Sequence, residues 1–465
     1  MPVDAPKPFG PLPTPRQLAW HKRGMYAFVH FTINTFTDKE WGYGDESPAL
    51  FSPSGFDADS IVRAAKDGGL TGLVLTAKHH DGFCLWPSKY TEHSVKKSPW
   101  KNGKGDMVRE FSDACRRHKI AFGVYLSPWD RNHKDYGRPE YLAYYRNQLR
   151  ELLTQYGNIF EVWFDGANGG DGYYGGARET RTIDNKTYYD WATTRALVRE
   201  LQPDACMFSD GGPDCRWVGN ESGYAGNPCW ATIKPDDIWP GHGEGEHLMR
   251  GDRDGAAWIP AEVDVSIRPG WFWHPNQDNV AKDEKRLTQI WFDSVGRGAN
   301  LILNLPPDRR GVLPEIDVLH LQKFNRHVSA MLAEDIARGA KVTASNERGG
   351  SRQFGAGNLT DGKDNSYWAT DDAVTAAEFV VTLPKLREIS VIKLVEHIAL
   401  GQRVDSFKVD VRIDGKWVPW VEGFQISSQR ILRGTPVVTD AVRVAVKASA
   451  CPCLTSVSIY REPHV

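Results

Sequence analysis

The strongest constraint on the fold is an alternation of short, β-rich apolar runs with amphipathic helical stretches, which continues from about residue 25 to residue 337. Strands are predicted at 27–31, 72–77, 121–127, 159–165, 205–209 and 300–305. Helices are predicted at 57–67, 106–118, 140–156, 187–201, 283–295 and 317–333. Repeated strand–helix units produce a parallel sheet, and over roughly 310 residues a (β/α)8-like barrel is its natural closure. A doubly wound sheet is the alternative, but no glycine-rich phosphate turn follows the first strand.

The pattern changes after about residue 339. Apolar and polar residues alternate in short runs joined by turns, at 378–383, 391–394, 407–413, 441–446 and 455–460. No helical period remains, and this alternation is typical of an antiparallel β-sandwich. The sequence therefore predicts two domains, a barrel at 1–337 that carries every candidate site residue and a C-terminal β-sandwich at 338–465.

Charge and hydropathy exclude two classes of partner. The 57 Lys and Arg residues nearly cancel the 59 Asp and Glu residues, and a net charge of −2 gives no electrostatic basis for binding nucleic acid. No apolar run approaches the roughly 18 residues of a membrane span, so no membrane partner is expected. The first 15 residues lack the apolar core of a signal peptide. We therefore expect a cytoplasmic protein, or a periplasmic or secreted one if a leader was removed.

Aromatic residues are abundant, with 17 Trp, 16 Tyr and 19 Phe. Proteins use Trp faces to grip the apolar side of a sugar ring, although Trp also fills large cores. The count is thus a first indication of a carbohydrate ligand.

The segment FEVWFDGANGG is the most informative for chemistry. Side chains alternate along a strand, so Glu161, Trp163 and Asp165 share one face, and the opposite face is entirely apolar. The apolar face must meet the helices, which places the Glu/Trp/Asp face inside the barrel. Asp165 then lies at the carboxyl end of a strand, where barrel enzymes carry catalytic groups. The alternative is an Asp that only caps the glycine-rich turn after it.

Other predicted strand ends supply polar and aromatic side chains: His30, the pair His79 and His80, and Tyr125. A metal site built on the three histidines and Asp165 is one interpretation, but no H-x-H or H-E-x-x-H spacing occurs. Neutral imidazoles that hydrogen-bond sugar hydroxyls fit a polar pocket better. We expect neither a metal nor another cofactor.

Acid/base catalysis on a glycoside needs a second carboxylate. Glu221 is framed by Gly219 and Gly223, so its loop could approach a ligand closely, although an ordinary loop glutamate would look the same. The other candidates are Asp210, Asp214, Glu262 and Asp264.

Taken together and in order, several motifs resemble glycoside hydrolase family 29, the α-L-fucosidases. They span residues 10–335 and read HFTINTFTDKEWGYG, TAKHHDGFCLWPSKYT, GVYLSPWDRN, EVWFDGANG, RWVGNESG, VDVSIRPGWFW and LNLPPDRRG. The resemblance implies a (β/α)8-like barrel, a retaining mechanism and a terminal α-L-fucosyl substrate. The tail motif NLTDGKDNSYWAT resembles the discoidin-like sandwich modules that often follow such barrels.

The resemblance also assigns roles to residues. Asp165 corresponds to the family nucleophile. The residues that correspond to those holding the fucose ring are His30, His79, His80, Tyr125 and Trp163, with Glu40 and Trp41 joining them. The WVGNE segment resembles the branch specific for α-1,3/1,4-linked fucose, in which the matching acid/base is Glu221, although an insertion-like stretch at 170–185 lengthens its distance from Asp165. Trp271 is expected to contact a neighbouring sugar, or else to fill the core.

The sequence therefore predicts a retaining exo-α-L-fucosidase that hydrolyses terminal α-1,3/1,4-linked fucose from oligosaccharides or glycoconjugates by double displacement. A broad-specificity α-L-fucosidase, a non-catalytic sugar-binding barrel and a metal-dependent barrel hydrolase are the alternatives.

Overall fold

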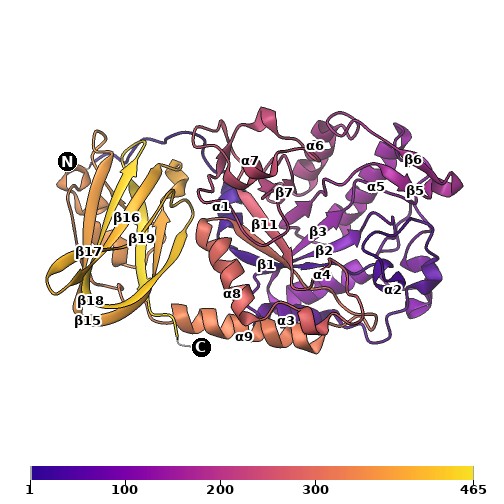
Figure 1. The fold of residues 1–465 in the computed structure, drawn as a ribbon. Helices are drawn as coiled ribbons and strands as arrows, with labels where there is room; N and C mark the ends of the chain where they lie inside the picture. Colours follow the sequence, from indigo (N-terminus) through magenta and orange to yellow (C-terminus); the bar gives the residue numbers. More distant parts are fainter. Residues whose placement is uncertain (1–2, 464–465) are drawn as a thin grey trace.

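The computed structural model describes residues 3–463 and consists of a barrel with a sheet domain beside it (Figure 1). Eight parallel strands close the barrel in the described chain, which confirms the predicted fold class. Around the barrel they follow the order β1 (Met25–Val29), β12 (Asn300–Asn304), β11 (Ala261–Ser266), β8 (Cys215–Trp217), β7 (Cys206–Ser209), β4 (Glu161–Trp163), β3 (Ala121–Leu126) and β2 (Gly72–Lys78).

All six predicted helices form around the strands, as α3 (Ala58–Asp67), α4 (Met107–His118), α5 (Glu140–Gln155), α6 (Trp191–Leu201), α8 (Glu284–Asp293) and α9 (Glu315–Leu332). Four of them begin at an aspartate whose side chain accepts a hydrogen bond from a backbone N–H of the first turn: Asp57, Asp106, Asp190 and Asp283. Such caps satisfy donors that the helix itself leaves unpaired, and they fix where each helix starts. The shorter helices are α1 (Pro15–His21), α2 (Asn34–Thr37) and α7 (Gly245–Arg250).

Strands β8 and β11 are absent from the sequence prediction, and no helix separates β7 from β8. A parallel connection ordinarily needs a dozen or more residues. Here β7 and β8 pair only through Phe208 with Cys215 and Ser209 with Arg216. Because the first residue of β8 lies level with the end of β7, the chain has only to cross to the neighbouring strand position. Residues 210–214 are enough to make this connection.

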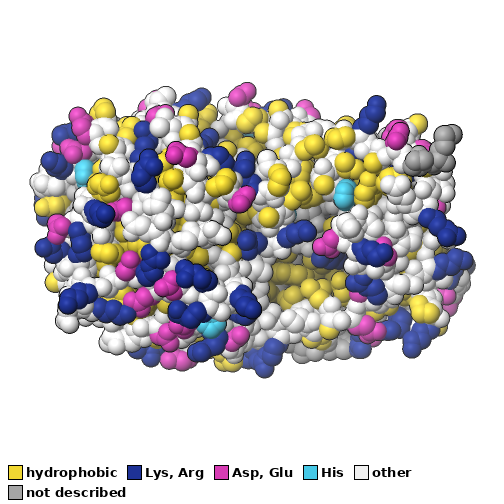
Figure 2. All heavy atoms as spheres, turned by 180° about the vertical axis from the view of Figure 1, so that it is seen from behind, with side chains coloured by type: hydrophobic (Ala, Val, Ile, Leu, Met, Phe, Trp, Pro, Cys, Tyr) yellow, Lys and Arg dark blue, Asp and Glu magenta, His cyan; other side chains and the backbone are white. Residues whose placement is uncertain are grey.

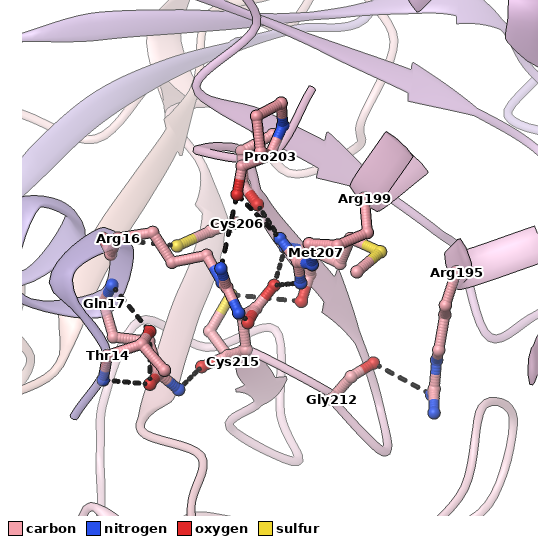
Figure 3. Close-up of polar contacts among 12 residues, drawn as sticks. Thr14, Arg16, Gln17, Arg195, Arg199, Pro203, Cys206, Met207, Gly212 and Cys215 are labelled. Atoms are coloured by element: carbon pink, nitrogen blue, oxygen red, sulfur yellow. Dashed lines mark hydrogen bonds and ion pairs between the residues drawn. The ribbon is translucent and has the colours of Figure 1, made fainter. Parts of the chain in front are cut away.

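Asp214 holds this short link to the rest of the barrel through Arg16, Arg199 and Met207, which are labelled in Figure 3. Its carboxylate accepts hydrogen bonds from Arg16 Nε at 3.0 Å and Arg199 Nη2 at 2.6 Å, and from the Met207 backbone N–H at 2.9 Å. The Asp214 carbonyl accepts from Gln17 Nε2 at 2.8 Å. Asp214 therefore joins α1, α6 and β7, and it does not line the cavity described below.

Two apolar layers confirm the predicted facing of β4 from Glu161 on, whereas Phe160, predicted on the helix side, packs against the inner core. Val162 and Phe164 belong to the core between strands and helices, whereas Trp163 belongs to the core inside the barrel. Trp20 of α1 and Tyr26 of β1 lie in that inner core as well. The Glu161–Trp163–Asp165 face thus points inward.

The C-terminal domain is one antiparallel sheet of long, bent strands, which confirms the expected antiparallel domain. Its order is β14 (Trp368–Ala369), β19 (Cys453–Tyr460), β15 (Ala376–Glu396), β18 (Arg430–Ala448), β16 (Val404–Ile413) and β17 (Lys416–Gly423), with β13 (Lys341–Ala344) also on β15. Register shifts between Thr382 and Arg387 and between Ile389 and Val391 bend β15. Two small hairpins complete the fold: β5 (Gly170–Gly172) with β6 (Glu179–Arg181), and β9 (Thr232–Ile233) with β10 (Ala257–Trp258).

The first residues that the structure describes, from residue 3 on, lie on the C-terminal domain before the chain enters the barrel. Phe9 N donates to Leu400 O at 3.0 Å, and Arg348 Nε donates to Asp4 O at 2.6 Å. Ile336 and Ala337, just after α9, already belong to the C-terminal core. Seen from behind, the molecule has a hollow near its middle in which hydrophobic side chains gather (Figure 2). None of the helices within residues 3–463 combines the length and apolarity that crossing a membrane requires.

Replacing Asp214 with Ala should lower the free energy of unfolding by about 2–3 kcal/mol, because two arginines and a buried N–H lose their shared acceptor. Urea denaturation measures this change. Asp440→Ala is the matched control, since the Asp440–Arg412 pair is open to solvent, which screens it, and should contribute much less. Equal losses in the two variants would contradict the role assigned to Asp214.

Candidate active site

A cavity of about 240 Å³ opens at the carboxyl ends of the barrel strands. The predicted site residues that line it are His30, Trp41, His79, His80, Trp163, Asp165, Glu221 and Trp271. The other lining residues are Phe28, Gly166, Ala167, Asp210, Trp217 and Asp264. Of the residues predicted for catalysis or substrate binding, Glu40 and Tyr125 do not line the cavity; of the alternative second carboxylates, Asp210 and Asp264 line it, whereas Asp214 and Glu262 do not.

Asp165 is held by two donors from neighbouring elements. Its Oδ2 accepts the Tyr125 hydroxyl at 2.9 Å, and its Oδ1 accepts the Ala167 backbone N–H at 2.7 Å. His80 Nε2 lies 3.7 Å from Oδ2. About a fifth of the side chain (22%) stays exposed, so this carboxylate is fixed in direction and reaches the cavity. Tyr125 therefore acts on the site through Asp165.

The three histidines are buried and uncharged. Burial lowers the pKa of His30 to about 3, and it lowers the pKa values of His79 and His80 as well. His30 Nδ1 lies 2.9 Å from Asn304 Oδ1, an oxygen that can only accept, so Nδ1 carries the proton and Nε2 remains an acceptor. His80 Nδ1 is paired with Ser127 Oγ at 2.7 Å. This arrangement presents neutral imidazole nitrogens to a polar ligand.

Glu40 organises the loop that carries Trp271. Its carboxylate accepts the backbone N–H groups of Trp271 at 2.8 Å and Phe272 at 3.2 Å, and it contacts His274 Nε2 at 2.5 Å. The same loop is held from below, because Asn304 Nδ2 donates to Trp271 O at 2.7 Å. The Trp271 indole is thereby fixed at the cavity wall.

Glu221 faces this indole across the mouth, where Trp271 Nε1 donates to Glu221 Oε2 at 3.1 Å. Burial and the neighbouring negative charge of Asp165 raise the pKa of Glu221 above its ordinary value. A carboxyl group with a raised pKa is suited to donating a proton. The cavity therefore pairs Asp165 with a second carboxyl group of different proton affinity.

Two further acidic side chains line the cavity. Burial and the charge of Asp165 raise the pKa of Asp210 to about 7. Burial raises the pKa of Asp264 well above its ordinary range, and Asp264 accepts Trp217 Nε1 at 2.9 Å. Glu262, the other candidate from the sequence, lies inside the barrel and does not line the cavity.

Some lining residues were not singled out from the sequence, among them Phe28, Gly166 and Ala167. Position 166 must be a glycine for a steric reason, and the sequence could have suggested it. A Cβ at this position would lie 1.9 Å from Asp210 Oδ2, so only glycine allows Asp210 to pack beside Asp165. The glycine directly after Asp165 was the available signal.

The residues of the metal hypothesis are only partly brought together. His79, His80 and Asp165 each offer a ligand atom, and these atoms lie within 4.8 Å of one another, without His30. This trio could hold a cation. However, the Asp165 oxygen nearest His80 already accepts the Tyr125 hydroxyl.

Comparisons with known proteins agree with one another. A sequence profile of the α-L-fucosidase family matches residues 9–331, and one of the F5/8 type C domain matches residues 341–457. Alpha-L-fucosidase 1 of Arabidopsis thaliana is 40% identical over 463 residues, covering 98% of this chain and 89% of its own. The solved structure of SpGH29 superimposes with a TM-score of 0.91 at 39% identity, over 99% of this chain and 100% of that one. A GH29 fucosidase of Ruminococcus gnavus, solved in complex with fucose, gives 0.90 at 32% identity, over 99% and 97% of the two chains.

Replacing Glu40 with Ala should free the backbone N–H groups of Trp271 and Phe272. Losing hydrogen bonds to a charged acceptor costs about 1–3 kcal/mol, so these amides should exchange with deuterium about tenfold to a hundredfold faster. Hydrogen exchange read by mass spectrometry on peptides over 268–275 measures this. Asp38→Ala is the control, because Asp38 contacts only the His274 side chain of this loop. Unchanged exchange in Glu40→Ala would show that the loop is held by other contacts.

Proposed function

The chain belongs to the α-L-fucosidase family of glycoside hydrolases, and we propose that it releases terminal α-1,3- and α-1,4-linked fucose from glycans by a retaining double displacement. Asp165 is the nucleophile and Glu221 the acid/base in this proposal. The observation that carries it is the presence, in one cavity, of an oriented carboxylate and a second carboxyl group whose pKa is raised by burial and by that carboxylate.

The first half of the reaction needs an attacking carboxylate and a proton donor. Asp165 attacks the anomeric carbon, forming a bond to it while the glycosidic bond breaks. Glu221 gives its proton to the departing oxygen. Tyr125 and the Ala167 N–H hold the two Asp165 oxygens, which leaves the carboxylate no freedom to turn away from the sugar.

The second half follows from the same electrostatics. Burial continues to raise the pKa of Glu221 throughout, but once Asp165 is esterified its negative charge no longer adds to that effect. Glu221 then holds its proton less tightly and acts as the general base on a water molecule, which displaces Asp165. These steps use side chains of this chain alone.

The polar and aromatic walls suit a deoxyhexose. Neutral nitrogens of His30, His79 and His80 can accept or donate hydrogen bonds to ring hydroxyls. Trp41, which is 52% exposed at the mouth, offers an apolar face, and Trp163 adds to the apolar wall. The linkage preference rests on the WVGNE segment, which resembles the α-1,3/1,4-specific branch, and on Trp271 at the wall where Glu221 stands.

Azide rescue of two variants tests the assignment. Asp165→Ala should lose activity by about 10³-fold or more, and azide should restore turnover by direct displacement to give a β-fucosyl azide. Glu221→Ala should lose about 10²–10⁴-fold on glycans and much less on an activated aryl fucoside, and azide should attack the glycosyl-enzyme to give the α-azide. NMR of each product decides the configuration. Asp210→Asn and Asp264→Asn are the matched controls.

Two outcomes would contradict the assignment. Near wild-type activity of Glu221→Ala on glycans, with loss in Asp264→Asn, would transfer the acid/base role to Asp264. Equal hydrolysis of α-1,2-, α-1,3- and α-1,4-linked fucosides by the unaltered protein would replace the linkage preference with broad specificity, while leaving the mechanism intact.

The basic side of the pH profile should depend on Glu221. The reaction needs Glu221 protonated, so kcat/KM should fall as the pH rises through its raised pKa. In Asp165→Asn the nearby charge is removed, and the pKa of Glu221 should drop. NMR titration of ¹³C-glutamate, with Glu221→Gln used to assign the signal, measures both values. An unchanged pKa in Asp165→Asn would contradict the coupling between the two carboxyl groups.

A further inference from the structure

Beneath the floor of the cavity the barrel interior contains a second pair of carboxyl groups, which the catalytic mechanism does not use. Glu161 of β4 and Glu262 of β11 are both fully buried. One oxygen of each carboxyl group and the Cys215 Sγ atom all lie within 4.8 Å of one another. Two like charges this close, away from water, are strongly unfavourable.

No positive charge compensates the pair within residues 3–463. The groups that contact the two carboxyls are the Trp20 and Trp163 indoles, the Tyr26 hydroxyl and the Cys215 thiol. All are neutral. The titratable groups that face the pair from neighbouring strands are Tyr26 of β1, Cys206 of β7, Cys215 of β8 and Asp264 of β11, and none of them supplies a cation.

The Tyr26 hydroxyl contacts both carboxyl groups, and its single proton limits which of these contacts it can make as a donor. Its hydroxyl oxygen lies within hydrogen-bonding distance of Glu161 Oε1, at 3.3 Å, and also of Glu262 Oε2. Trp20 Nε1 already donates to the same hydroxyl at 2.9 Å. A tyrosine has one proton, so it can donate to only one of the two carboxyls. The other contact is a hydrogen bond only if that carboxyl brings a proton of its own.

The hydrogen-bond donors around Glu161 differ from those around Glu262. Glu161 Oε1 faces three donor groups, namely the Tyr26 hydroxyl, the Cys215 thiol at 3.5 Å and Trp20 Nε1 at 3.1 Å, whose single N–H is shared with Tyr26. Glu161 Oε2 has no hydrogen-bond partner among the described residues, so it is the donors that converge on Oε1 that favour a charged Glu161. Glu262 Oε1 receives only Trp163 Nε1, at 2.8 Å. Burial raises the pKa of both groups, and the charge on Glu161 raises that of Glu262 further.

We propose that Glu161 and Glu262 hold one proton between them, that Glu262 carries it and donates it to Tyr26, and that Glu262 is thereby a positioning residue for the fucose-binding pocket. Tyr26 passes its own proton on to Glu161. The free oxygen of Glu262 then fixes the Trp163 indole. Trp163 lines the cavity and stacks on Phe208 at 4.0 Å and on Tyr125, the tyrosine that orients Asp165.

Infrared difference spectroscopy on ¹³C-glutamate-labelled protein detects the proton directly. At neutral pH we expect a carboxylic-acid band that disappears in Glu262→Gln and remains, shifted, in Glu161→Gln. Glu396→Gln is the control for another buried glutamate, since burial raises the pKa of Glu396 to about 7 in the C-terminal domain. Absence of a band that depends on Glu262, or its loss in Glu161→Gln alone, overturns the proposal.

Fucose affinity, measured by calorimetry, tests the positioning role. Glu262→Gln keeps an acceptor for Trp163 and a donor for Tyr26, so it should bind fucose within about threefold of the unaltered protein. Glu262→Met removes the acceptor and should weaken binding about tenfold, a loss that one neutral hydrogen bond explains. Trp163→Phe keeps an aromatic ring at this position but lacks the indole N–H, so it should lose at least a similar factor even if Glu262→Met folds poorly. The positioning role of Glu262 is overturned if Glu262→Gln and Glu262→Met bind fucose equally well, or if Trp163→Phe loses no affinity for fucose.

The proposal assumes that the pocket binds fucose, but it does not depend on which carboxyls catalyse the reaction. The infrared band is read without substrate, and binding is read without turnover. Failure of the Asp165 and Glu221 assignments would therefore leave both measurements unaffected.

Discussion

The site depends on a single geometric constraint, the alternation of side chains along β4. Because successive residues of a strand point to opposite faces, Glu161, Trp163 and Asp165 form a column that runs from the barrel interior to its mouth. A shift of one residue would turn the whole column toward the helices and bring Val162 and Phe164 inside. The packing of those two residues in the outer core is therefore what commits β4 to its register.

Burial is what gives neighbouring carboxyl groups different properties. Asp165 is partly exposed and receives two donors, whereas Glu221, Asp210 and Asp264 have pKa values raised mainly by burial. Several acidic groups can share one end of the barrel because burial favours the protonated forms of Glu221, Asp210 and Asp264. Environment, rather than residue type, thus separates an attacking group from a proton donor.

The sequence predicts the parts of this fold that leave a long or periodic signal. The helices and six barrel strands are periodic over enough residues to be recognised, and the face of β4 follows from alternation alone. Strand β8 has only three residues, and β11 carries Glu262 and Asp264 inside the barrel, so neither resembles a buried strand. Long-range hydrogen bonds of single side chains also leave no pattern in the sequence. Nothing near Glu40 in sequence indicates that it holds the Trp271 backbone, 231 residues away. The residue assignments that follow from family resemblance remain predictions, although the structure gathers most of them around one cavity.

The course of the first residues has a mechanical consequence. From residue 3 the described chain lies on the C-terminal domain, crosses to the barrel as α1, and returns to that domain after α9, so one covalent connection and one segment docked by hydrogen bonds join the domains. Domains joined by one linker can swing as rigid bodies, whereas two separate connections restrict such a hinge. Trp20, in α1 after the docked segment, also packs inside the barrel and donates to Glu161. Any force that pulled the domains apart would therefore be transmitted to the base of the pocket, which makes the C-terminal domain a brace for the catalytic barrel.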